Sequence, residues 1–165
     1  NQGYDTDDYK KFIKGTRQLN VEFVEQPFPK ENIDQMRSLD EQYKSLIAVD
    51  ESLQNEEDAA LIATTPRACG IFNIKLMKSG GIYSAMKIAA IANKANIDLM
   101  WGCMDESKIS IAAGLHAAFA CPNTKYIDLD GSLDLARDLV SGGFEIKEGM
   151  MHTLNAPGLG VQRLS

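Results

Sequence analysis

The strongest constraint on the fold of this chain is a regular spacing of marker residues at the ends of short apolar runs. Glu25, Asp50 and Lys75 lie 25 residues apart, each after an apolar run and before a helix-like segment. Trp101 follows 26 residues further on, and Asp128 lies 27 residues beyond it, in the same position relative to an apolar run. Strands that alternate with helices in this way indicate βαβ units and a parallel sheet.

The expected elements follow from this pattern. Strands are expected over residues 21–25, 45–50, 70–77, 97–103 and 126–129, and strand pieces over 144–146 and 150–154. Helices are expected over residues 5–19, 31–43, 55–64, 81–96, 107–118 and 133–139. The first five strands are nearly continuous apolar runs, which is typical of strands covered on both faces.

Two architectures fit five such units. An open doubly wound sheet would use one switch point, whereas a (β/α)8 barrel gathers all its strand ends into one ring. Polar residues recur at the carboxyl ends of successive strands, and this favours the barrel. We therefore expect an α/β fold, the C-terminal portion (about five βα units) of a (β/α)8 TIM-like barrel, over residues 1–143. Residues 144–165 are expected to form a short irregular tail.

Composition excludes several classes of protein. With 44% apolar and 24% charged residues, the chain reads as an ordinary globular protein. Its net charge of −6 and its lack of a basic, aromatic-interleaved patch argue against a nucleic-acid partner. No apolar stretch approaches the about 20 residues needed to cross a bilayer, so no membrane association is expected. Three widely spaced cysteines in apolar surroundings, Cys69, Cys103 and Cys121, are typical of reduced core thiols and of the cytoplasm.

The strand ends carry candidate catalytic groups. Glu25 and Asp50 should point into the same space, and oxygen ligands from separate strands are suited to Mg²⁺. Lys75, partly desolvated beside a metal, should have a lowered pKa and could act as a general base. The alternative is that Glu25 and Asp50 are solvated or salt-bridged strand-end residues and that Lys75 is a snorkelling lysine at a strand end. Lys78 is expected to be such a snorkelling lysine.

Asp128 and Asp130 form a second candidate site. Side chains alternate along a strand, so these two carboxylates share one side. Like charges so placed are unfavourable unless a cation lies between them, which makes an ammonium group or a metal the expected guest. The alternative is a solvated acidic turn before Gly131.

These motifs together resemble the enolase superfamily. Val24-Glu-Gln-Pro27, Ala48-Val-Asp-Glu-Ser52 and Asn73-Ile-Lys-Leu-Met-Lys-Ser-Gly-Gly81 are similar to its muconate-lactonising-enzyme subgroup. Gly102-Cys-Met-Asp-Glu-Ser-Lys108 and Asp128-Leu-Asp130 are similar to the dipeptide epimerases within it, such as the L-Ala-D/L-Glu epimerases. The resemblance covers essentially the whole chain.

The resemblance implies a Mg²⁺-dependent isomerase, a racemase or epimerase acting on amino acid derivatives. It would epimerise a dipeptide by 1,1-proton transfer through an enediolate intermediate. Glu25 and Asp50 would be two of three metal ligands, Lys75 one of two catalytic lysines, and Asp128 and Asp130 would hold the dipeptide's α-ammonium. The third ligand, the other lysine and the capping domain are expected upstream of Asn1. The tail from residue 144 would return toward that domain, and the chain alone is expected to be inactive.

Asp105 is the residue expected to determine substrate specificity. By resemblance, Asp105 borders a substrate side chain and would favour a basic or small polar dipeptide. Cys103 and Trp101 either line the pocket or pack in the core.

The alternatives to a dipeptide epimerase are a cycloisomerase or an o-succinylbenzoate synthase-like lyase, whose substrates carry no ammonium for Asp128 and Asp130, or a catalytically inert fragment. A homo-oligomer is left open.

Overall fold

The computed structural model describes residues 1–164 and is organised around one parallel sheet. Five strands lie in the order β1-β2-β3-β4-β5, and all four pairings are parallel. Their bounds are β1 (Val24–Glu25), β2 (Ile47–Val49), β3 (Ile71–Lys75), β4 (Asp98–Gly102) and β5 (Thr124–Ile127). The five strands expected from the 25-residue spacing are confirmed, although each is shorter than, or shifted from, its expected range.

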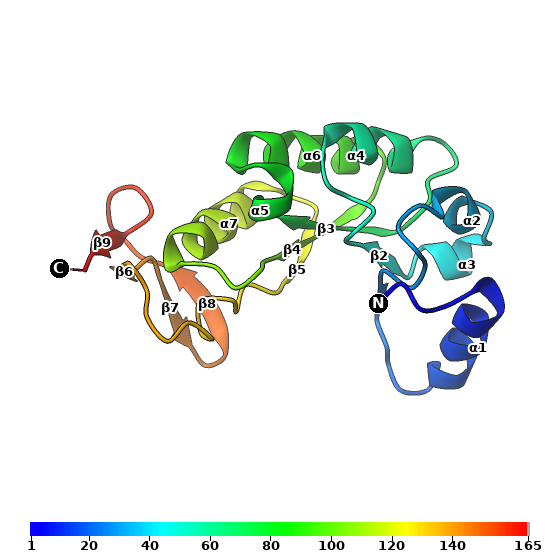
Figure 1. The fold of residues 1–165 in the computed structure, drawn as a ribbon, viewed down its shortest axis with the longest axis horizontal. Coiled ribbons are helices and arrows are strands. Elements are labelled where there is room, and N and C mark those ends of the chain that lie inside the picture. The colour runs from blue at the N-terminus through cyan, green and yellow to red at the C-terminus, as the bar shows by residue number, and fades with distance from the viewer. Residues whose placement is uncertain (165) are drawn as a thin grey trace.

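Helices alternate with these strands. They are α1 (Thr6–Thr16), α2 (Ile33–Arg37), α3 (Glu41–Lys44), α4 (Glu56–Ala63), α5 (Leu76–Ser79), α6 (Ile82–Lys94) and α7 (Lys108–Ala120). Figure 1 shows α4, α6 and α7 on one side of the sheet. Asp5, Asn55 and Ser107 cap α1, α4 and α7 by accepting backbone N–H bonds, as short polar side chains do at helix starts.

The main core lies between this helical layer and the sheet. Phe72 and Ile74 of β3 and Trp101 of β4 are almost completely buried there. Trp101 also donates from Nε1 to the Thr124 hydroxyl at 3.1 Å, so it packs in the core. Many of the residues along α7 are alanine, which allows the helix to approach the sheet closely.

The opposite face of the sheet carries a small apolar cluster, and the polar residues Asn73 and Lys75 lie on the same face, closer to the carboxyl end of β3. Ala48, Ile71 and Met100 form a buried cluster there, and Phe23 and Tyr126 pack against it. Phe23 directly precedes β1 and Tyr126 lies in β5, and the centroids of their rings are 4.7 Å apart. Because side chains alternate along β3, Asn73 and Lys75 point to this same face.

Two helix predictions were wrong. The helix expected over residues 31–43 is broken between α2 and α3, where Asp40 is extended (ψ 150°) and Ser38 bonds back to the Gln35 carbonyl. The helix expected over residues 133–139 does not form. There the Asp138 carboxylate accepts from the adjacent Leu139 N and from Lys108 N, the first residue of α7. A local bond such as that to Leu139 N competes with helix formation.

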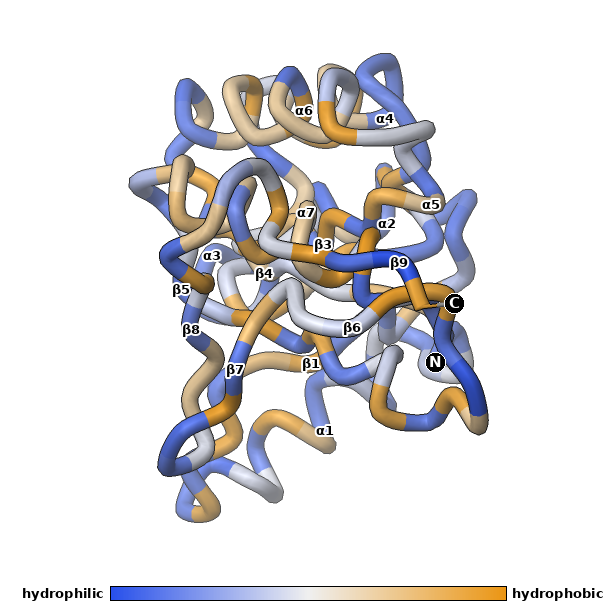
Figure 2. The backbone as a smooth tube through the Cα atoms, turned by 90° about the vertical axis from the view of Figure 1, so that its left-hand side faces the viewer, coloured by the Kyte–Doolittle hydropathy of each residue, from blue (hydrophilic) through white to orange (hydrophobic). Residues whose placement is uncertain are grey.

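The C-terminal region adds two small antiparallel pairs. Strand β7 (Phe144–Lys147) pairs with β8 (Met150–Thr153), which confirms the two expected strand pieces, and β6 (Val140–Gly142) pairs with β9 (Val161–Arg163). Glu148 and Gly149 both have positive φ, as a two-residue hairpin turn requires. This turn is hydrophilic (Figure 2). The tail's last residue, Ser165, lies outside the described residues.

Within residues 1–164, none of the helices has the length and apolarity that a membrane crossing requires.

Candidate functional site

The carboxyl ends of the first three strands bring together Glu25, Asp50 and Lys75. Glu25 ends β1, Asp50 directly follows β2, and Lys75 ends β3. The Lys75 ammonium donates to Asp50 Oδ2 at 2.8 Å. Asn73 Nδ2 donates to Glu25 Oε1 at 2.9 Å and so links β3 to β1 across β2. Three residues far apart in the sequence thus form one half-buried polar cluster.

The cluster contains two carboxylates and two ammonium groups, those of Glu25, Asp50, Lys75 and Lys78. Burial raises the pKa of Glu25, and the negative charge of Asp50 raises it further. Burial alone would also raise the pKa of Asp50, but the ammonium groups of Lys78 and Lys75 outweigh it and hold that pKa below its ordinary value. Two carboxylates facing one space repel each other unless a positive charge lies between them.

Lys75 is paired with Asp50 in this structure. Burial lowers the pKa of Lys75, but the hydrogen bond and charge of Asp50 raise it by more, so the net shift is upward. The lowered pKa expected for Lys75 beside a metal therefore stays a prediction. A cation that takes over the Asp50 charge would remove this stabilisation of the ammonium.

Gln26 is a structural member of the site that the sequence analysis missed. Its side chain is 1% exposed and makes four hydrogen bonds. Oε1 accepts from the backbone N–H groups of Asp50 (2.9 Å) and Ser52 (3.1 Å), while Nε2 donates to the Phe28 carbonyl and the Ser52 hydroxyl, both at 2.9 Å. This amide fixes the segment that carries Asp50 against the end of β1.

Asn73 and Gly102 are a second pair that the sequence analysis missed. Asn73 is 1% exposed, and its Oδ1 is buried without a hydrogen-bond partner among the described residues. A Cβ on Gly102 would lie 2.4 Å from that oxygen and 3.1 Å from Lys75 Cε. Glycine at this position of β4 leaves the space that the Asn73 amide and the Lys75 side chain occupy.

Lys78 is also part of the site, contrary to expectation. It is not a snorkelling lysine: its ammonium turns inward onto Asp50 Oδ1, the Asp50 carbonyl and the Asn73 carbonyl. Burial lowers its pKa, and the charge of Asp50 only partly compensates. The one-turn helix α5 makes this possible, because it folds Lys78 back toward the end of β2.

The second candidate site lies at the end of β5. Asp128 and Asp130 are exposed there, with Leu129 buried between them. The Cys103 thiol lies against both, with Sγ 3.3 Å from the Asp128 carbonyl and 3.7 Å from Asp130 Oδ1. The two aspartates line a hollow of about 460 Å³ whose other wall is the β7–β8 hairpin, including Ile146 and Met150.

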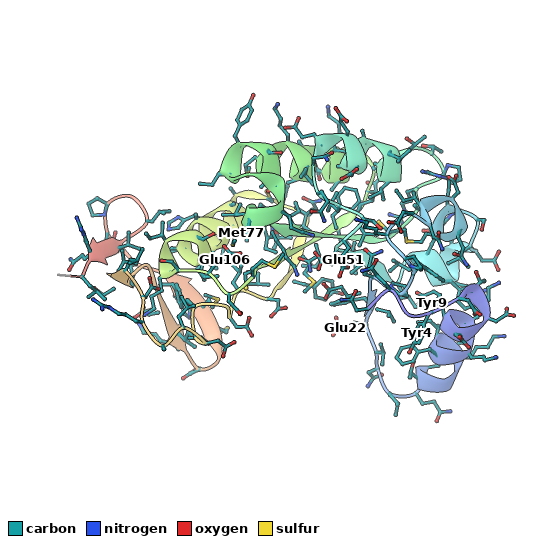
Figure 3. The ribbon with its side chains drawn as sticks, in the orientation of Figure 1. Tyr4, Tyr9, Glu22, Glu51, Met77 and Glu106 are labelled. Carbon is teal, nitrogen blue, oxygen red and sulfur yellow. The ribbon has the colours of Figure 1, made fainter. Side chains whose placement is uncertain are left out.

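Asp105 lies on the loop between β4 and α7 and is exposed. Hydrogen bonds to two carboxylates hold this loop in place. Glu106, at the N-terminal end of α7 (Figure 3), accepts from Met104 N at 2.8 Å and from the Ser110 hydroxyl. Asp138 accepts from the Ser107 hydroxyl (2.7 Å) and from Lys108 N (2.8 Å). Asp105 is thereby presented on an anchored loop.

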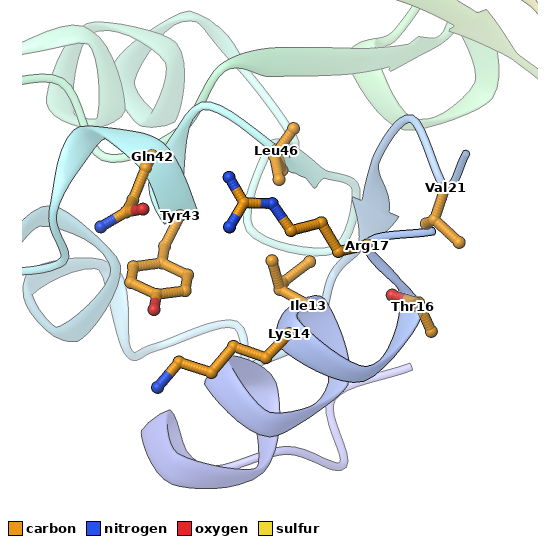
Figure 4. Close-up of a pocket in the computed structure, with 8 residues that line it drawn as sticks. All are labelled: Ile13, Lys14, Thr16, Arg17, Val21, Gln42, Tyr43 and Leu46. Atoms are coloured by element: carbon orange, nitrogen blue, oxygen red, sulfur yellow. The ribbon is translucent and has the colours of Figure 1, made fainter. Parts of the chain in front are cut away.

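A further hollow, of about 330 Å³, is unrelated to these groups. It lies between α1 and α3 and is lined by Lys14, Arg17 and Gln42 together with apolar residues (Figure 4). Val21 and Leu46, which precede β1 and β2, form part of its wall. It therefore lies at the amino ends of the strands, away from Glu25 and Asp50.

The donor set at the first three strands fits a magnesium ion only in part. Glu25 and Asp50 offer carboxylate oxygens, which are the ligands Mg²⁺ prefers. Among residues 1–164 no cluster of three or more His, Cys, Asp or Glu side chains could hold a metal. These residues therefore supply two ligands, and further ones would come from water, substrate or other parts of the protein.

The fold and this site define the class of protein. Residues 1–163 match the family described as enolase C-terminal domain-like, and the chain belongs to that family. Its parallel strands and alternating helices are accordingly the C-terminal part of an enolase-superfamily barrel.

The relatives of this chain are dipeptide epimerases and related enzymes. It is 55% identical over 161 residues to the L-Lys-D/L-Arg epimerase of Methylococcus capsulatus. That alignment covers 98% of this chain and 45% of that protein. It is 37% identical over 147 residues to the L-Ala-D/L-Glu epimerase of Clostridium acetobutylicum, with 89% of this chain and 41% of that protein covered. The chain thus spans about half the length of the curated relatives it matches.

Solved structures agree with this assignment. The dipeptide epimerase from Methylococcus capsulatus complexed with a Mg ion superposes with a TM-score of 0.97 at 54% identity, over 99% of this chain and 48% of that chain. A structure of that enzyme with Mg and the dipeptide L-Arg-D-Lys gives a TM-score of 0.95 at 55% identity, over 98% of this chain and 46% of that chain.

Proposed function

We propose that the protein containing this chain is a Mg²⁺-dependent epimerase of dipeptides, with a preference for dipeptides that carry a basic side chain. The observation that carries the proposal is the convergence of Glu25, Asp50 and Lys75 at adjacent strand ends. The similarity to L-Lys-D/L-Arg epimerases supports it. Three free thiols support a reducing, cytoplasmic location.

In this proposal Lys75 moves the α-proton of the substrate. Its neutral amine takes the proton, the electron pair of the C–H bond stays on the substrate, and return of a proton to the opposite face inverts the centre. Magnesium held by Glu25 and Asp50 would supply positive charge against the negative charge that develops on the substrate carboxylate. The opposing lysine and the remaining ligand are expected from outside this chain.

Substrate binding is assigned to the end of β5. Asp128 and Asp130 are exposed, and both carboxylates border one hollow. An α-ammonium group placed between them would relieve their mutual repulsion. Cys103, against both aspartates, would line the same pocket. Cycloisomerase substrates lack this ammonium, so the pair favours a dipeptide, although chloromuconate cycloisomerases are also relatives at 37% identity.

Deuterium exchange would test the activity. The full-length protein is incubated in D₂O with Mg²⁺ and a dipeptide library, and mass spectrometry follows exchange at the α-carbon. We expect exchange and epimerisation of cationic dipeptides. In Lys75→Ala we expect loss of epimerisation, with exchange confined to the epimer whose α-proton faces the opposing lysine, and we expect no loss in the surface control Lys87→Ala, whose ammonium pairs with Glu56. Wild-type protein that exchanges no dipeptide would overturn the proposal.

The assigned preference depends on Asp105, whose carboxylate would pair with the substrate's basic side chain. An exposed ion pair contributes up to about 1 kcal/mol, or roughly a fivefold effect. We therefore expect Asp105→Ile to shift kcat/KM away from cationic and toward neutral dipeptides by up to about that factor. An unchanged order of substrates would refute the role of Asp105 and leave the epimerase activity unaffected.

A further inference from the structure

The Lys78 ammonium is a fixed part of the polar cluster. Its side chain is 6% exposed. An ammonium group has three N–H donors, and here three oxygens receive them: Asp50 Oδ1, the Asp50 carbonyl at 2.7 Å and the Asn73 carbonyl at 3.1 Å. Lys78 is therefore fully satisfied by protein groups.

The backbone after β3 is shaped to deliver this group. Helix α5 starts directly after Lys75 and ends within one turn, because Gly80 adopts a left-handed conformation with φ +78°. Gly81 follows with φ +115° and starts α6. Lys78 thus reaches back from the turn to the end of β2, and it ties the Asp50 and Asn73 backbones together.

This arrangement divides the two oxygens of Asp50. Oδ1 is held by Lys78, while Oδ2 accepts from Lys75 at 2.8 Å. Within residues 1–164 that is the only hydrogen bond of the Lys75 ammonium, whereas Lys78 makes three. An incoming divalent cation would therefore displace Lys75 from Oδ2 more readily than Lys78 from Oδ1.

Ligation through one oxygen favours a small ion. Mg²⁺ requires near-octahedral geometry at about 2.0–2.1 Å, whereas Ca²⁺ takes 6–8 ligands and often binds both oxygens of one carboxylate. An oxygen that already accepts from a buried ammonium is a weaker metal ligand, so the pairing of Asp50 Oδ1 with Lys78 disfavours binding of one metal through both oxygens.

We propose that Lys78 is a positioning residue that restricts Asp50 to single-oxygen ligation and thereby favours Mg²⁺ over Ca²⁺. This inference rests on the proposed metal site at Glu25 and Asp50. It assigns to Lys78 no contact with substrate or with the reacting atoms.

Metal titration of the full-length protein would test it. Isothermal titration calorimetry gives the affinities for Mg²⁺ and for Ca²⁺ in the wild type, in Lys78→Met and in the control Lys44→Met. Lys44 is another buried lysine, but it pairs with Glu41 on α3. We expect Lys78→Met to lower the ratio of Mg²⁺ to Ca²⁺ affinity about tenfold, the size typical of outer-shell changes at metal sites. Lys44→Met should leave the ratio unchanged.

The outcomes separate the two proposals. An unchanged ratio in folded Lys78→Met overturns the role of Lys78, while a wild type that binds neither ion overturns the metal site itself. If Lys78→Met does not fold, a crystal structure of the wild type with Mg²⁺ decides. Lys78 on Oδ1 and the ion on Oδ2 support the inference, and an ion bound to both oxygens refutes it.

Discussion

Replacing Gly102 with alanine tests how tightly the cluster is packed. The added Cβ would lie 2.4 Å from Asn73 Oδ1 and 3.1 Å from both Asn73 Nδ2 and Lys75 Cε. Asn73 is 1% exposed, so its amide has little room in which to rotate away. The variant must therefore displace the amide from Glu25, or shift the strand.

The cost follows from these contacts. Overpacking a buried site costs about 1–3 kcal/mol, and a hydrogen bond to a charged acceptor contributes about 1.5–3 kcal/mol. We expect Gly102→Ala to lower the free energy of unfolding by about 2.5–6 kcal/mol in total. Urea denaturation followed by circular dichroism measures this value.

Two comparisons make the test specific. A Cβ on Gly15, in α1, meets nothing within 4 Å, so Gly15→Ala should stabilise the protein by about 0.5–1 kcal/mol. Asn73→Ala removes the clashing atoms, so the double variant with Gly102→Ala should be more stable than the sum of the two single effects predicts. A Gly102→Ala protein as stable as wild type, or strictly additive effects, would refute the steric reasoning.

Three further predictions concern other buried groups. Gln26→Leu leaves the backbone N–H groups of Asp50 and Ser52 and the Phe28 carbonyl unpaired, and we expect a loss of at least about 3 kcal/mol in urea denaturation. Burial raises the pKa of Cys69 to about 12, so iodoacetamide at pH 8 should alkylate the half-buried Cys103 first and Cys69 only on unfolding, as peptide mass spectrometry will show. Burial also raises the pKa of Tyr9, so the folded state keeps a proton that the unfolded state releases. Stability should therefore fall as the pH rises above about 10, and the urea midpoint of Tyr9→Phe should depend less on pH in this range.

The order of strands and helices could be predicted because the same βα unit repeats along the chain. The spacing of Glu25, Asp50 and Lys75 reflects one βα unit per 25 residues, and parallel strands bring their carboxyl ends to one edge. Those three side chains could be expected near one another for that reason alone. The helix expected over residues 133–139 failed because Asp138 accepts from the Ser107 hydroxyl and from Lys108 N at the start of α7, and the periodicity of apolar residues cannot reveal such a contact.

The supporting residues could not be predicted in the same way. Gln26, Asn73 and Lys78 are polar residues whose roles depend on which strand lies beside them, and at what register. One signal was present: Asn73 is a polar residue inside an apolar strand, and a buried amide needs partners. Lys78 gave no such signal, since only the tight turn of α5 distinguishes it from a surface lysine.

The strand order has a consequence for how the chain folds during synthesis. The sheet order β1-β2-β3-β4-β5 is also the order along the chain, so each strand pairs with the one translated just before it. Every βα unit can dock as it leaves the ribosome, with loop closures of about 25 residues and no waiting for distant partners. The contact between Phe23 and Tyr126 is the exception, because it needs the fifth strand. This contact therefore forms only after the residues of the polar cluster have already been assembled.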